Sequence, residues 1–369
     1  MKRFSILILT LCLCLTGCGK QTTEATAQIF AMDTVMEIAA YGSKAEEAVQ
    51  ETKGRIKALE NQLSRTKADS NVSRVNHNGT TPTTGLTYGM RALLPAALEY
   101  RDATNGAFDI TIAPVMDAWG FTTEERHVPA PDALAAAMAL VDSEELSVDT
   151  ELNELLKHVN SDEIQVQEEP SYSVTLGEGQ AIDLGGIAKG YTSDLVEQTF
   201  RANGIESGKI SLGGNVFVLG GKPDGSDWRG GIRDPQDENA LAAVLTLRDA
   251  YAITSGGYER YFEENGKTYH HIIDPSTGYP ADSGLLSVTV VAADNGPDWA
   301  GAGNGAMCDA FSTALFVMGE EQALDFWRNG GYDFDLVLVT EDGRVVITAG
   351  LADRLEEVKD SGYTYETVS

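Results

Sequence analysis

The chain has 369 residues, of which 42% are hydrophobic, and its formal net charge is −29. This length suits one large domain or two small ones, and the hydrophobic content excludes wholesale disorder. The negative charge argues against nucleic-acid binding and against electrostatic adhesion to anionic lipid. A protein this acidic needs local positive charge, from a metal ion or a helix terminus, to hold a phosphate-bearing ligand.

The first residues have the pattern of an export signal. Two basic residues precede an apolar run over residues 4–15, which is too short to span a membrane as a mature helix. The run ends in Leu-Thr-Gly-Cys, which resembles a bacterial lipoprotein box and predicts a signal peptide over residues 1–17 and a lipidated Cys18. An ordinary signal peptide with a chance cysteine is the alternative. We expect a lipid-anchored protein on the extracytosolic face of the cell membrane, with residues 18–27 as the lipidated cysteine and tether.

Hydrophobic periodicity and turn residues predict the remaining elements in chain order. In the first half these are a strand over 28–41, helices over 43–64, 84–104 and 132–141, and a loop or short turn over 70–76. In the second half they are a hairpin over 164–174, a helix within 181–201, a strand over 209–219 broken by a glycine pair, strands over 228–233, 241–247, 251–254 and 285–292, a helix over 309–318 and a closing hairpin over 336–348. Strands and helices mix without strict alternation, which predicts an α+β fold with one or two lobes over residues 28–355 and a C-terminal tail over 356–369.

The stretch 181–201 reads AIDLGGIAKGYTSDLVEQTFR and predicts a glycine-rich turn that leads into an amphipathic helix. Asp183 can cap this helix, and Gly185 and Gly186 leave backbone amides and carbonyls open to a ligand. Lys189 adds a cation on the next turn. These features resemble an anion-binding site at a helix N-terminus, but an ordinary α/β turn has the same sequence pattern. This stretch alone therefore does not distinguish a binding site from a structural turn.

Two further patterns bear on chemistry. Asp309 and Thr313 are four residues apart on a predicted helix, so their oxygens share one face. With a carbonyl from the glycine turn they make an all-oxygen set suited to Mg²⁺, although such a pair is more often a helix cap and a surface hydroxyl. His271 precedes an apolar stretch and would suit a general base if neutral, although a histidine there is more often a core residue.

Seven blocks of the sequence occur in a characteristic order and spacing: AMDTVMEI, AFDITIAPV, IDLGGIAKGY, SLGGNV, ITSGGYERYF, HHIIDPSTG and CDAFSTAL. Together they resemble the ApbE family, the FAD:protein FMN transferases, from about residue 28 to residue 319. The resemblance implies an ApbE-like, T-fold-related structure and an enzyme that binds FAD and Mg²⁺. Such an enzyme attaches FMN by a phosphoester bond to a Thr or Ser hydroxyl of a partner flavoprotein and releases AMP.

The resemblance also implies roles for individual residues. The metal ligands would be Asp309, Thr313 and the backbone carbonyl of Gly186. His271 would be the base that takes the proton of the acceptor hydroxyl. The residues implied to line the FAD site are Met32, Ala107, Phe108, Asp109, Asp183, Lys189 and Ile272.

The sequence departs from the family pattern at three positions. Asp33 stands where glycine is common, which adds a side chain and a charge near the flavin nucleotide. Thr66 stands about where an aromatic residue is often found, which removes an expected stacking partner of the isoalloxazine ring. Gly186 replaces a common alanine, which we expect to be harmless because the ligand would be a backbone oxygen.

The implied acceptor carries a motif resembling Asp/Asn-x-x-Ser/Thr-Gly-Ala-Thr and belongs to an extracytosolic electron-transfer complex. This sequence contains no such string, so we do not expect self-flavinylation. Two alternatives stay open. An FAD pyrophosphatase would use water as the acceptor and give FMN and AMP, and a lipid-anchored flavin-binding protein would hold FAD without any reaction.

Overall fold

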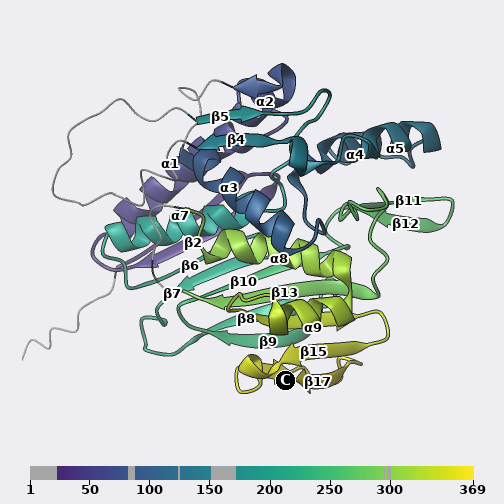
Figure 1. Ribbon diagram of the computed structural model, residues 1–369. Helices are drawn as coiled ribbons and strands as arrows, with labels where there is room; N and C mark the ends of the chain where they lie inside the picture. Colours follow the sequence, from purple (N-terminus) through teal and green to yellow (C-terminus); the bar gives the residue numbers. More distant parts are fainter. Residues whose placement is uncertain (1–22, 82–87, 124, 151–171, 295, 297–300) are drawn as a thin grey trace, which may run out of the picture.

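The computed structural model describes residues 23–81, 88–123, 125–150, 172–294, 296 and 301–369 (Figure 1). The predicted signal peptide and Cys18 lie outside these residues, as does most of the hairpin predicted over 164–174. Within the described ranges, no helix is both long enough and apolar enough to cross a membrane.

A large sheet forms the middle layer of the fold (Figure 1). Among the described residues it has nine strands, in the order β1-β2-β6-β7-β10-β13-β14-β15-β17. Neighbouring strands are antiparallel except β15 and β17, which are parallel. Their bounds are Glu24–Ala31 (β1), Thr34–Tyr41 (β2), Ser207–Leu212 (β6), Asn215–Leu219 (β7), Ala250–Gly256 (β10), Leu285–Ala293 (β13), Asp335–Thr340 (β14), Arg344–Thr348 (β15) and Thr364–Val368 (β17). The first and last strands therefore lie at opposite edges of one sheet.

Helices cover one face of this sheet and enclose the largest of three apolar cores among the described residues (Figure 1). They are α1 (Ala45–Leu63), α3 (Tyr88–Ala103), α7 (Ala188–Ala202), α8 (Asn304–Met318) and α9 (Glu320–Asn329). The helix α8 packs against α7, α3, α9 and the strands β10 and β13, so it is apolar around most of its circumference. This central position makes α8 a rigid support for any side chain it carries.

A small sheet covers the opposite face. Its strands are β8 (Trp228–Arg233), β9 (Leu241–Leu247) and β16 (Leu355–Glu357), and they enclose the second core. Because side chains alternate along a strand, Val216 and Val218 of β7 point into this second core, whereas Phe217 belongs to the core on the helical side. Asn215 shares the face of Phe217, which directs it toward the helices.

Smaller elements complete the fold. A third apolar cluster around Trp119 joins α4 and α5 to the β11–β12 hairpin. The bounds of the elements in this part of the molecule are Asn71–Asn78 (α2), Thr80–Thr81 (β3), Ile110–Ile112 (η2), Ala113–Ala118 (α4), Pro131–Met138 (α5), Ser143–Glu145 (η3), Ser147–Thr150 (β4), Tyr172–Thr175 (β5), Tyr261–Glu264 (β11), Lys267–His270 (β12) and Ala349–Leu351 (η5).

The α+β class is confirmed, and the strands predicted over 228–233 and 241–247 have the predicted bounds. The single strand predicted over 28–41 is wrong, because Met32 and Asp33 turn the chain into the β1–β2 hairpin. Residues 71–76 belong to a helix, α2, rather than to a loop or short turn. Ser70 caps its first turn by accepting a hydrogen bond from Ser73 N at 2.9 Å.

Three boundaries also differ from prediction. The strand β1 begins at Glu24, so part of the tether expected over 18–27 is paired with β2. The segment expected as a tail over 356–369 contains β17, which pairs with β15. The helix expected from residue 309 begins five residues earlier, at Asn304.

Candidate active site

The helices α7 and α8 cross at two glycines. A methyl group on Gly190 would lie 2.0 Å from the carbonyl oxygen of Gly305, and one on Gly305 would lie 2.4 Å from the carbonyl oxygen of Gly190. Only glycine at both positions permits so close a contact between the backbones. The crossing brings the Gly190 amide within 2.8 Å of Asp309 Oδ2, to which it donates a hydrogen bond.

Asp194 of α7 fixes the first turn of α8. Its carboxylate accepts hydrogen bonds from the amides of Gly305 (2.7 Å), Gly303 (3.0 Å) and Ala306 (3.1 Å). These amides have no partner within their own helix, and a negative charge at a helix N-terminus is stabilising. The carboxylate of one helix therefore serves as the cap of the next, and it sets the position of α8 relative to α7.

Asp309 is held from two sides within this crossing. Its second oxygen, Oδ1, accepts a hydrogen bond from Asn215 Nδ2 at 2.9 Å, and only 3% of the residue is exposed. Burial raises the pKa of Asp309, and the positive charge of Lys189 opposes this rise. Both carboxylate oxygens of Asp309 thus accept hydrogen bonds from the protein.

Gly186 and Thr313 lie next to each other. A methyl group on Gly186 would lie 3.6 Å from Thr313 Oγ1, although the two residues are far apart in sequence. Thr313 Oγ1 donates to the backbone oxygen of Asp309 at 3.3 Å, and it lies 3.2 Å from Ser255 Oγ. The glycine turn therefore contacts α8 at Thr313, one helical turn after Asp309.

Asp183 does not cap α7, contrary to prediction. The helix begins at Ala188 and no side chain caps it. Asp183 instead accepts a hydrogen bond from Gly185 N at 2.8 Å and forms an ion pair with Arg65 at 3.0 Å. Arg65 also pairs with Asp117 at 2.6 Å, so this guanidinium joins the glycine turn to α4.

Phe108 and Asp109 support the turn from the other side. The Phe108 ring lies 3.1 Å from where a methyl group on Gly186 would stand, so the alanine common at this position would require the ring to shift. Asp109 Oδ1 accepts hydrogen bonds from Thr111 N (2.8 Å), Thr111 Oγ1 (2.7 Å) and Ser143 Oγ (2.5 Å). Asp109 therefore caps η2, while Ala107 beside it is partly buried against the main core.

His271 lies at the base of the β11–β12 hairpin. Its Nδ1 is 3.2 Å from the carbonyl oxygen of Arg260, which can only accept, so Nδ1 carries the proton and Nε2 is left with a lone pair. Burial, together with the nearby charges of Arg260 and Lys189, lowers the pKa of His271 to about 3. The ring is therefore neutral near pH 7, as a general base must be.

The neighbouring histidine provides a contrast. His270 Nε2 donates to the carbonyl oxygen of Ala281 at 3.1 Å, and its Nδ1 accepts from the amide of Ile272 at 3.3 Å. Both ring nitrogens are thus occupied by the backbone. In the described part of the chain, Nε2 of His271 has no such partner, so His271 is the histidine of this pair that can move a proton.

The β1–β2 turn forms the opposite rim. Met32 and Asp33 both adopt left-handed backbone angles, with φ of 50° and 58°. The Met32 amide donates to Glu60 Oε1 at 2.9 Å, and its sulfur accepts from Thr192 Oγ1 of α7 at 3.5 Å. Asp33 is 3.7 Å from the guanidinium of Arg260, which connects this rim to the His271 side.

Lys189 links the two chemical centres. Its positive charge acts on both Asp309 and His271, so the predicted metal ligand and the predicted base share one electrostatic environment. Ile272 is buried beside His271, and Thr66 is exposed beyond the end of α1. The roles implied for the flavin-lining residues and the metal ligands remain predictions, and the structure places Gly186 beside Thr313, one helical turn from Asp309.

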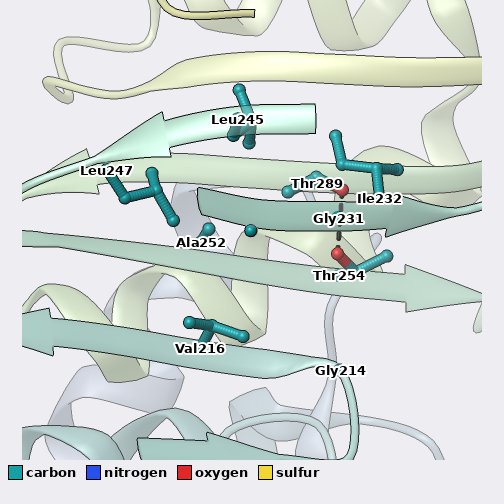
Figure 2. Close-up of a pocket in the computed structure, with 10 residues that line it drawn as sticks. Gly214, Val216, Gly231, Ile232, Leu245, Leu247, Ala252, Thr254 and Thr289 are labelled. Carbon is teal, nitrogen blue, oxygen red and sulfur yellow. Dashed lines mark hydrogen bonds between the residues drawn. The ribbon is translucent and has the colours of Figure 1, made fainter. Parts of the chain in front are cut away.

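A small cavity lies elsewhere, on the opposite face of the large sheet (Figure 2). Its volume is about 30 Å³, and it lies between β7, β10 and the β8–β9 pair. Val216 and Ala252 face Ile232 and Leu245 across it (Figure 2). A space of this size holds a water molecule or two and cannot admit a nucleotide, so it is not the candidate site.

The sequence alone did not indicate several residues that build the site. They are Arg65, Gly190, Asp194, Asn215, Ser255 and Gly305. Asn215 lies in the block SLGGNV, and as a polar residue in an alternating strand it shares the face of buried Phe217, but neither signal gave it a role. Among the described residues, no three His, Cys, Asp or Glu side chains gather as a metal cluster.

Known sequences are similar to this chain over nearly its whole length. A family model described as ApbE family matches residues 32–336. A Haemophilus influenzae protein named FAD:protein FMN transferase is 29% identical over 365 residues, which cover 96% of this chain and 98% of that protein. A Klebsiella pneumoniae protein of the same name is 32% identical over 310 residues, which cover 84% of this chain and 86% of that protein.

Solved structures of ApbE proteins are similar to this chain in fold. The crystal structure of the ApbE protein from Thermotoga maritima has a TM-score of 0.73 at 28% identity and covers 91% of this chain and 97% of its own. The apo form of the Pseudomonas stutzeri flavinyl transferase ApbE has a TM-score of 0.70 at 28% identity. The match covers 87% of this chain and 92% of that structure's chain. The resemblance noted in the seven sequence blocks is confirmed, and the chain belongs to the ApbE family.

Proposed function

We propose that this protein is a Mg²⁺-dependent FAD:protein FMN transferase. It would cleave the pyrophosphate of FAD, attach FMN through a phosphoester bond to a Thr or Ser hydroxyl of a partner flavoprotein, and release AMP. The names of its relatives support transfer of FMN from FAD to a protein. The dependence on Mg²⁺ is supported by one observation: Gly186 lies beside Thr313, one helical turn from the Asp309 carboxylate, which the amides of Gly190 and Asn215 hold in place.

The donors at this place fit Mg²⁺. The carbonyl of Gly186, the carboxylate of Asp309 and the hydroxyl of Thr313 are hard oxygen ligands, and Mg²⁺ prefers such ligands while it keeps positions for phosphates and water. When bound, Mg²⁺ would neutralise charge on the phosphoryl oxygens. The amide donors to Asp309 favour its ionised form and so oppose the rise in its pKa that burial causes.

His271 supplies the base. The acceptor hydroxyl attacks the phosphorus of the FMN half, and its proton passes to Nε2 of His271. The bond from that phosphorus to the bridging oxygen breaks, and AMP leaves with the bridging oxygen. The carbonyl of Arg260 holds the tautomer that leaves Nε2 ready for this proton. Lys189 is placed to offset negative charge near both His271 and Asp309.

We propose a lipid anchor at Cys18 and an extracytosolic acceptor as part of this function. The sequence pattern of residues 1–18 supports the anchor. The acceptor would be a subunit of an electron-transfer complex that carries the Asp/Asn-x-x-Ser/Thr-Gly-Ala-Thr-like motif. Mass spectrometry of the N-terminal peptide from membranes would detect the acyl groups, and an unmodified N-terminus in the soluble fraction would contradict the anchor.

The test incubates protein from residue 19 onward with FAD, Mg²⁺ and an acceptor that carries this motif. Covalent flavin fluorescence on the denatured acceptor, with AMP in equal amount, would support transfer. His271→Ala should lower kcat about 10²- to 10⁴-fold while FAD still binds. His77→Ala is the matched control, because His77 is exposed on α2, and it should leave kcat unchanged.

The other outcomes identify the alternatives. AMP release without labelled acceptor would indicate an FAD pyrophosphatase, for which water takes the place of the acceptor hydroxyl. FAD binding without AMP, unchanged by Asp309→Ala, would indicate a flavin-binding protein without enzymatic activity. Full activity of His271→Ala would remove the base assignment.

A further inference from the structure

Asn215 is a buried polar residue that the proposed reaction does not yet use. It is the first residue of β7 and has no exposed surface. Strand alternation points it toward the helical face, and its register partner on β10 is the apolar Ile253. An asparagine in this position costs desolvation of both its amide atoms unless each finds a partner.

One end of the Asn215 amide has a partner. Its Nδ2 donates to Asp309 Oδ1 at 2.9 Å, and because an ionised carboxylate only accepts, the amide nitrogen must face Asp309. The Gly190 amide holds the other carboxylate oxygen at 2.8 Å. Asn215 and Gly190 therefore fix the plane of the Asp309 carboxylate from the sheet side and the helix side.

The other end of the amide, the oxygen Oδ1, has no hydrogen-bond partner among the described residues. Asn215 Oδ1 is buried, and no described residue donates a hydrogen bond to it. An unsatisfied buried acceptor destabilises the folded protein, because it loses its hydrogen bond to water without gaining another. A leucine would fill nearly the same volume without that cost, so packing alone does not explain an asparagine here.

We propose that Asn215 is a positioning residue for Asp309, and that its unpaired Oδ1 accepts a hydrogen bond from a water molecule that the divalent cation brings. This inference rests on the proposed function, since it assumes the cation bound by Asp309. Partners that orient a ligand carboxylate commonly control metal affinity without touching the metal. Mg²⁺ sites usually retain several waters, which supplies the donor that Oδ1 lacks.

The test measures Mn²⁺ binding by electron paramagnetic resonance, which counts the free ion and does not depend on turnover. Asn215→Leu keeps the volume and removes both amide contacts. We expect it to weaken Mn²⁺ binding about 10- to 100-fold. In the transfer assay the KM for Mg²⁺ should rise similarly, while the KM for FAD changes less than about twofold.

Thr289→Val is the matched control. It removes a partly buried hydrogen bond between Thr289 and Thr254 (2.8 Å) on the neighbouring strands β13 and β10, on the face away from Asp309. Mn²⁺ affinity should match that of the unmodified protein. If circular dichroism shows that Asn215→Leu does not fold, Mn²⁺ binding is measured on Asn215→Ser instead. The serine side chain is too short to reach Asp309, so this variant also removes the contact.

The outcomes separate this inference from the proposed function. If the unmodified protein binds Mn²⁺ and the folded Asn215 variant binds it within twofold, the positioning role is overturned while the cation site stands. If the unmodified protein binds no Mn²⁺, the cation site itself is overturned, and this inference with it. A loss of affinity in Thr289→Val equal to that in the Asn215 variant would also overturn it, because the effect would then be general.

Discussion

The two sides of the candidate site are built differently. On the metal side, α7 and α8 touch backbone to backbone at Gly190 and Gly305, and Asp194 joins them through three amide hydrogen bonds. On the opposite rim, the β1–β2 turn meets the His271 side through one ion pair, with 3.7 Å between Asp33 and Arg260. Both partners of that pair are well exposed, so it contributes little stability.

This difference suits the proposed chemistry. Charge neutralisation on a phosphoryl group depends on ligands held in place before the substrate binds, and the buried crossing provides this. A rim that closes around a protein acceptor has to admit a large partner, for which a weak exposed link is suitable. We therefore expect substitutions on the metal side to cost both stability and activity, and substitutions on the rim to cost little stability.

The largest effect on stability should come from Gly190→Ala. The added methyl group would lie 2.0 Å from the Gly305 oxygen and 2.6 Å from Asp309 Cβ, so the helices must separate. We expect unfolding free energy to fall by about 3 kcal/mol or more in urea denaturation, with loss of transfer. Gly54→Ala in α1 is the matched control, since no atom lies within 4 Å of its new methyl group. It should raise stability by about 0.5–1 kcal/mol. Equal effects at both positions would contradict the close crossing.

Asp194→Asn should have the next largest effect. Asparagine replaces one acceptor oxygen by an NH₂ group, which then faces at least one of the amides at the start of α8. We expect a loss of about 1–3 kcal/mol in unfolding free energy. Hydrogen exchange should show faster opening of the first turn of α8. An unchanged melting temperature would show that the cap does not hold the metal side together.

The pH dependence of stability probes the His271 side. The folded-state pKa of His271 is about 3, below the ordinary value of 6.5, so only the unfolded chain takes up this proton between these values. Stability should therefore be complete above pH 6.5 and fall as the pH drops toward 3, by at most about 1.4 kcal/mol per pH unit. Partial exposure of the ring reduces this slope. Comparing unfolding of the unmodified protein with His271→Asn isolates the effect, and identical pH profiles would contradict it.

Asp33→Gly should have the smallest effect. Glycine adopts the φ of 58° without strain, but it also increases the entropy of the unfolded chain, and the exposed pair with Arg260 is lost. We expect a change in unfolding free energy of less than about 1 kcal/mol. Asp33→Asn removes the charge and tolerates the same backbone, so it separates strain from charge. A loss above 2 kcal/mol would show that the rim is held as firmly as the metal side.

Much of the fold could be predicted where periodicity and turn residues agree. The strands β8 and β9 have the predicted bounds, and a turn residue precedes each of them, Gly225 before β8 and Asn239 before β9. The β1–β2 hairpin was missed because its turn is Met32-Asp33, and neither residue is the glycine or asparagine that favours positive φ at both positions. The contact of Met32 with Glu60, distant in sequence, helps to stabilise this turn.

The site was predictable only in part. Family blocks pointed to Gly186, Asp309 and Thr313, and the structure brings these elements together. Helix α2 was missed although Ser70 and Gly79 flank it as an N-cap and a left-handed C-cap, so that signal was present in the sequence. Asp194 and Asn215 could not be found from spacing, because their partners lie about a hundred residues away on another helix.

The most direct test is to locate a divalent cation in the folded protein. Crystals grown with Mn²⁺ and FAD, measured at the manganese absorption edge, would give an anomalous difference peak. We expect this peak between the carbonyl of Gly186, the carboxylate of Asp309 and the hydroxyl of Thr313. A fully occupied peak elsewhere, with these three groups bound only to water or protein, would contradict it.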